Sequence, residues 1–163
     1  TTEIYTLSLH DALPICFGEI AYDPQQVLTF PQGLIGFEEL REFVVMPNSK
    51  EGPLFWIQSV EDAQVALVLT DPTNFFLDYR VVPEAHERAI LGIEADEPCF
   101  NLVVVTVHPD RRITLNLAAP ILFAARTNRA LQVILENSGY SIQTPLPVVQ
   151  PATPPQQAAS ASA

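Results

Sequence analysis

The sequence predicts an all-β fold, mainly antiparallel, in which a compact barrel-like or sandwich-like sheet is accompanied by one or two short helices. Short segments rich in β-branched and aromatic residues recur along most of the chain. Turn-forming proline, asparagine, aspartate and glycine separate many of these segments. Helical character is confined to a short acidic turn near residues 38–42 and to residues 84–91. A chain of 163 residues is long enough for one domain with a proper core, but not for two.

The two ends of the chain differ from the segment between them. Residues 1–15 look like the in-frame translation of a sequencing-adapter oligonucleotide, and we expect them to be a non-native extension. They lack the basic start and the apolar centre of a signal peptide. Residues 144–163 contain no charged residue and are dominated by proline, alanine, glutamine and serine, which predicts a disordered tail. The predicted domain therefore comprises residues 16–143.

The composition restricts the classes of partner. Lys and Arg total 8 against 19 Asp and Glu, which gives a net charge of -11. Such a field repels nucleic-acid phosphates and favours a basic protein partner, so direct nucleic-acid binding is not expected. No apolar run approaches the ~20 residues that span a bilayer, so no membrane contact is expected. Once residues 1–16 are set aside, Cys99 is the one secure cysteine, which fits a reducing cytoplasm.

Strands are expected where β-branched and aromatic residues concentrate: 17–22, 26–30, 43–46, 54–59, 64–70, 77–82, 100–107, 113–117, 120–123 and 130–135. The first two would form a hairpin around Asp23-Pro24, since this pair favours a turn. Pro83 would begin the helix over residues 84–91, and Gly92 would end it. Residues 108–112 are expected to form a hairpin loop between two of the later strands.

The segment from residue 30 to residue 40 is the most distinctive part of the chain. Pro31 fixes one backbone angle, while Gly33 and Gly36 can adopt positive φ without steric cost. The spacing of the two glycines does not indicate a phosphate-binding loop, because no Lys, Ser or Thr follows them. Three apolar side chains of this segment are expected to fold back over the core: Leu34, Ile35 and Phe37.

The sequence contains no recognisable catalytic or metal-binding motif. His86 and His108 are isolated, and neither a Cys-x-x-Cys nor a His-Glu-x-x-His pattern occurs. We therefore expect no enzyme activity, no cofactor and no metal. A small hydrolase or metal enzyme stays open as a minor alternative. It would require residues distant in sequence, for example Ser59, His108 and Asp71, to meet in one pocket.

The segment over residues 30–40 resembles the hallmark of the FliW family of flagellar assembly factors, in Phe30-Pro31-Gln32-Gly33-Leu34 and Gly36-Phe37-Glu38. The resemblance continues in the same order through Phe55-Trp56 with Gln58-Ser59, Thr70-Asp71-Pro72, Phe75-Phe76 with Asp78-Tyr79, Asn116-Leu117 with Ala119-Pro120-Ile121, and Gln132-Val133-Ile134-Leu135 with Tyr140. It covers essentially the whole predicted domain. Two features depart from the family pattern: Ile35 stands where proline is usual, and the tail is an addition.

The resemblance implies a small β-rich cytoplasmic protein without catalytic activity. Such proteins bind flagellin before its export and also bind the RNA-binding translational regulator CsrA. Once flagellin has been exported, the freed protein captures CsrA and relieves the repression of flagellin translation. An acidic antagonist would be steered electrostatically toward CsrA. Flagellin would instead contact apolar surface, or add a strand to an open sheet edge. A chaperone that binds flagellin alone is the nearest alternative.

The candidate partner-binding residues are mostly acidic. The carboxylates that we expect to face a basic partner are Glu38, Glu39, Glu42, Asp71 and Asp78. For each of them the alternative is a solvated carboxylate or one that caps a turn. Asn116 opposes the propensity of its predicted strand, so it is either paired locally or exposed on a contact face.

Overall fold

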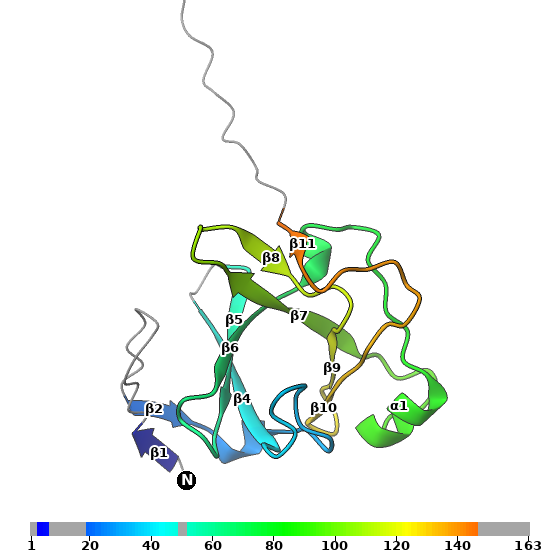
Figure 1. The fold of residues 1–163 in the computed structure, drawn as a ribbon. Coiled ribbons are helices and arrows are strands. Elements are labelled where there is room, and N and C mark those ends of the chain that lie inside the picture. Colours follow the sequence, from blue (N-terminus) through cyan, green and yellow to red (C-terminus); the bar gives the residue numbers. More distant parts are fainter. Residues whose placement is uncertain (1–2, 7–18, 49–51, 147–163) are drawn as a thin grey trace, which may run out of the picture.

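The computed structural model describes residues 3–6, 19–48 and 52–146, with side chains from residue 22 onward (Figure 1). Its strands, in chain order, are β1 (Glu3–Thr6), β2 (Glu19–Tyr22), β3 (Leu28–Thr29), β4 (Glu42–Pro47), β5 (Leu54–Ser59), β6 (Ala66–Thr70), β7 (Phe100–Val107), β8 (Ile113–Leu115), β9 (Ile121–Ala124), β10 (Arg129–Gln132) and β11 (Thr144–Pro145). Its helices are the 3-10 turns η1 (Pro24–Gln26) and η2 (Pro72–Asn74) and the α-helix α1 (Ala85–Leu91).

Most of the strands belong to one sheet of nine strands, which closes on itself (Figure 1). β7 pairs with β6 along one edge, while its other edge pairs first with β9 and then with β8. β9 pairs with β10, and β10 meets β3 in a parallel pairing through Arg129 and Thr29. The remaining pairs within this sheet are antiparallel. The prediction of a mainly antiparallel, barrel-like sheet is therefore confirmed.

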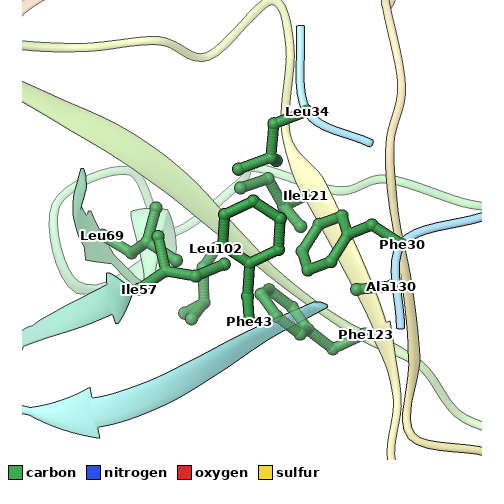
Figure 2. Close-up of a cluster of buried hydrophobic side chains, with 9 residues drawn as sticks. All are labelled: Phe30, Leu34, Phe43, Ile57, Leu69, Leu102, Ile121, Phe123 and Ala130. Carbon is green, nitrogen blue, oxygen red and sulfur yellow. The ribbon is translucent and has the colours of Figure 1, made fainter. Parts of the chain in front are cut away.

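The main core fills the inside of this closed sheet (Figure 2). Alternate residues of the strands point inward, as the period of two requires. The fully buried members of the cluster include aromatic rings from separate parts of the chain, and Phe30 lies edge-on to Phe43 with ring centroids 4.9 Å apart. Phe30 also meets Phe123 edge-on, at 6.5 Å. The segment after β3 is thus anchored in the core by its first residue.

The helix α1 covers the outer face of β9 and β10. Glu84 and Glu87 form a reciprocal capping box at its start, and Gly92 ends it in the left-handed conformation with φ 69°. The predicted helix over residues 84–91 is confirmed within one residue. Among the described residues, no helix is long and apolar enough to cross a membrane.

One predicted strand pairing and one predicted strand are wrong. Residues 17–22 and 26–30 do not form a hairpin, because β2 pairs with β1 while β3 pairs with β4 and β10. Asp23 instead caps η1, accepting a hydrogen bond from the Gln25 N–H at 2.9 Å. Residues 77–82 form no strand. Within this segment Tyr79 is buried and donates its hydroxyl to the Leu117 carbonyl at 2.8 Å, whereas Leu77, on the same predicted face, is 79% exposed.

The acidic turn and the end of the domain also differ from the prediction. The acidic turn near residues 38–42 is not helical, and Glu42 is the first residue of β4. At the other end, β11 pairs with β8 and Leu146 packs on an outer apolar cluster, so ordered chain continues past the predicted limit at residue 143. Residues 147–163 of the tail predicted over 144–163 lie outside the described residues, as do residues 1–2 and 7–15 of the predicted N-terminal extension and residues 16–18 at its junction.

Candidate partner-binding surfaces

The loop between β3 and β4 is folded tightly around its two glycines. Gly33 has φ 71° and Gly36 has φ 88°. Leu34 accepts a hydrogen bond from the Phe37 N–H at 2.8 Å and is buried in the core. Ile35, however, is 51% exposed, and Phe37 is 37% exposed. The prediction that this segment folds back over the core is therefore correct for Leu34 and wrong for Ile35.

Gln132 of β10 fixes this loop to the barrel. Its Oε1 accepts a hydrogen bond from the Ile35 N–H at 2.9 Å, and its Nε2 donates to the Ala119 carbonyl at 3.1 Å. The guanidinium of Arg41 also donates to the carbonyl of Pro31 in this loop. Sequence reasoning noted Gln132 within a family motif, but it did not predict this role, because the bond joins residues 97 positions apart.

Four exposed carboxylates gather where this loop joins the barrel, and we call them the loop-end carboxylates: Glu38, Glu39, Glu42 and Glu61. Glu38 accepts a hydrogen bond from the Gly36 N–H at 2.9 Å, and this bond lowers the pKa of Glu38 below its ordinary value. Glu61 accepts from the N–H groups of Arg41 at 2.5 Å and Glu42 at 2.8 Å. Sequence reasoning missed Glu61, because only the pairing of β4 with β5 brings it to the loop.

The other two acidic candidates lie at the opposite end of the barrel. Asp71 follows β6 and caps η2, accepting from the Thr73 N–H at 2.8 Å and from its hydroxyl at 2.6 Å. Asp78 is exposed in the next turn. The register pairs Thr70 with Leu54 at the start of β5. At the end of β5, Ser59 pairs with Phe43, which is next to Glu42, and Glu61 follows. Six residues of β5 separate the ends, about 17 Å at ~3.3 Å a residue. The five predicted carboxylates therefore form two separate groups.

Asn116 is paired locally. It lies between β8 and β9, is partly buried, and its Oδ1 accepts a hydrogen bond from the Ala119 N–H at 3.0 Å. This bond supports a turn that redirects the chain from the end of β8 toward β9. The sequence left open whether Asn116 is paired locally or exposed on a contact face, and the structure shows local pairing.

The hydrolase alternative receives no support from the geometry. Ser59 Oγ accepts from the N–H groups of Glu61 and Asp62, at 3.1 and 3.0 Å. His108 Nε2 lies 2.8 Å from the Thr114 hydroxyl, and Asp71 is engaged with Thr73 at the far end of β6. The three side chains are therefore not brought into one pocket. Within the described ranges, no group of three His, Cys, Asp or Glu residues could hold a metal ion.

Two grooves mark the surface of the barrel. The first, which we call the β10 groove, has a volume of about 670 Å³ and runs along residues 131–136 between α1 and the loop residue Gln32. Val82 and Ile134 line it with side chains that are 77% and 66% exposed. The second, of about 690 Å³, lies over β5 to β8 and is lined mainly by apolar side chains, Trp56 and Val105 among them.

Comparisons with known proteins point to a single family. The profile of the family described as FliW protein matches residues 15–146. The flagellar assembly factor FliW of Syntrophotalea carbinolica is 65% identical over 131 residues, which cover 80% of this chain and 94% of that protein. The flagellar assembly factor FliW 2 of Desulfotalea psychrophila is 59% identical over 134 residues, covering 82% and 89%. A crystal structure of the flagellar assembly factor FliW superposes with a TM-score of 0.76 at 26% identity, covering 88% of this chain and 96% of that one.

Proposed function

This chain belongs to the FliW family, and on that premise we propose that it is a cytoplasmic flagellar assembly factor that binds both flagellin and CsrA. In this proposal it acts by protein–protein contact and has no catalytic activity. Flagellin occupies the protein while flagellin is abundant. When flagellin is exported, the freed protein captures CsrA, and translation of flagellin resumes. The observation that carries the proposal is the exposed carboxylate surface of a chain with net charge -11.

The loop-end carboxylates are the part of this surface best suited to a basic partner. CsrA binds RNA, so it must present positive charge to the phosphates. Among the described residues, ion pairs involve Glu84, Glu97 and Asp110, none of which is a loop-end carboxylate. Glu39 and Glu42 thus keep their charge available to an incoming cation. Exposed charges of this kind mainly raise the rate of association.

A competition experiment tests the proposal as a whole. The full chain is incubated with purified CsrA and purified flagellin monomer as separate baits, and then with both together. We expect capture by each bait and displacement of CsrA by flagellin. Capture by flagellin alone would favour the chaperone that binds only flagellin. If the folded protein is captured by neither bait, the proposed function is wrong.

Charge reversal at the two ends of the barrel tests which carboxylates matter. Glu39→Lys with Glu42→Lys changes the loop end, while Asp78→Lys supplies a control at the opposite end. We leave Asp71 unchanged because it caps η2, and its replacement would also disturb the fold. Rim charges act on association, so we expect the loop-end variant to bind CsrA about tenfold more slowly at low salt. A larger effect from Asp78→Lys would move the CsrA surface to the η2 end.

A further inference from the structure

The edge of β10 is left open by a proline that follows the neighbouring strand β3. The parallel pairing of β3 with β10 is held by the Thr29 N–H, which donates to the Asn128 carbonyl at 2.8 Å. Backbone N–H groups of an extended segment point alternately to its two sides. Two residues after Thr29, the next N–H group directed toward β10 would be that of Pro31. Proline has no N–H, and the ladder ends there. The chain then turns into the loop of Gly33. Gln132 at the end of β10, and residues 133–135 that follow it, therefore have no backbone partner on this side among the described residues.

This edge presents unpaired backbone groups. The N–H groups of Val133 and Leu135 donate toward β9, to Pro120 at 3.0 Å and to Ala118 at 2.8 Å. Amides of an extended strand alternate between its two sides, so the N–H groups of Gln132 and Ile134 point the other way. No hydrogen bond joins either of these N–H groups to another described residue. They border the β10 groove, which Gln132 and Ile134 line.

The walls of the groove define the chemistry of an occupant. Val82 and Ile134 supply exposed apolar side chains. The charged lining is mainly acidic, because three carboxylates stand against one guanidinium: Glu84, Glu87, Glu136 and Arg80. The Arg80 guanidinium donates to the carbonyls of Leu77 and Tyr79 at 3.0 and 2.9 Å. A polypeptide with apolar side chains and a basic residue therefore complements this groove in both respects.

We propose that an extended segment of a protein partner adds to the edge of β10 as a strand, with an apolar side chain against Val82 and Ile134 and a basic side chain toward the acidic rim. This inference rests on the proposed function and assigns the site to flagellin. A subunit that awaits assembly still exposes apolar surface that its polymer later buries. Backbone hydrogen bonds to β10 would supply the contact, and the two walls would select the side chains.

Residue-resolved amide exchange of the full chain, with and without flagellin monomer, tests the proposal directly. Strand addition should slow exchange of the Gln132 and Ile134 amides at least tenfold. The amides of Val133 and Leu135 are already bonded and should change little. If flagellin binds while the Gln132 and Ile134 amides exchange as in the free protein, the site is wrong and the proposed function stands. If flagellin does not bind at all, the proposed function fails and this inference falls with it.

Two substitutions at Ile134 separate the contribution of its backbone N–H to flagellin binding from that of its side chain. Ile134→Pro removes one N–H of the edge and keeps the bonds to β9, so we expect its affinity for flagellin to fall at least tenfold. Ile134→Ala keeps the N–H and should cost a few-fold. Ile142→Ala, at a residue that is 64% exposed outside the groove, should have no effect. Unchanged binding by a folded Ile134→Pro variant would overturn the proposal. So would a dimer of the free protein, found by light scattering, in which the two amides are already protected.

Discussion

Replacing Gly33 by alanine should destabilise the protein far more than the same change at Gly36. Both residues have positive φ, 71° and 88°, so each substitution incurs the cost of a left-handed alanine, about 1 kcal/mol. Their surroundings differ. A Cβ on Gly33 would lie 2.6 Å from the Glu38 Cα and 2.7 Å from its carbonyl oxygen, whereas a Cβ on Gly36 meets nothing within 4 Å. Gly36→Ala is therefore a matched control for backbone strain alone.

The added Cβ at residue 33 would meet backbone atoms of Glu38, which cannot rotate away as a side chain can. The loop must shift by roughly 1 Å, and Leu34, which is 1% exposed, is displaced with it. Overpacking of this kind costs about 1–3 kcal/mol. We expect a total loss of about 3 kcal/mol for Gly33→Ala and about 1 kcal/mol for Gly36→Ala, measured by urea unfolding with equal slopes. Equal losses in the two variants would refute the steric argument, and so would a loss below 1 kcal/mol at Gly33.

Three further changes test the core and one exposed ion pair. Tyr79→Phe leaves the buried Leu117 carbonyl without its donor and should cost about 1–2 kcal/mol in urea unfolding; no loss would mean that water replaces the hydroxyl. Phe43→Ala, at a side chain that is 1% exposed, should cost about 3–5 kcal/mol, and a loss under 1 kcal/mol would contradict the closed core. The Arg126 hydrogen bond, aided by the Glu94 N–H, lowers the pKa of Glu97 from 4.5 to about 2. This lowered pKa contributes stability above pH 4.5 that is lost as the pH falls through about 2. Arg126→Gln should therefore flatten the decline of the unfolding midpoint between pH 5 and pH 3, and an unchanged decline would contradict the assignment.

The strands that sequence predicts best are those that are apolar on both faces. β5 and β7 begin and end at the predicted residues, because their flanking turns are polar and their interiors are rich in β-branched and aromatic side chains. The helix α1 was also predictable, since its acidic start and its terminal glycine are local signals. The prediction of a strand over residues 77–82 was wrong for the converse reason. Leu77, Tyr79 and Val81 recur with the period of a strand, but no strand of the described residues pairs with this segment.

Pairing between strands could not be predicted, and the candidate sites depend on it. The sequence indicated which carboxylates were plausible, but the register of β4, β5 and β6 separates Glu42 from Asp71 by the length of the barrel. The same register brings Glu61 to the loop. The local readings were more reliable: Asp71 caps a turn as one alternative predicted. The prediction that residues 1–15 are non-native stays a prediction.

Pro31 connects the two proposed sites. By ending the ladder between β3 and β10 it opens the β10 groove, and it also begins the loop that leads to the loop-end carboxylates. The two surfaces adjoin, because Gln32 lines the groove and the Ile35 N–H is bonded to Gln132 on β10. A strand added at β10 would therefore lie against the loop that CsrA is proposed to contact. On these two proposals, flagellin and CsrA compete because their sites share this loop.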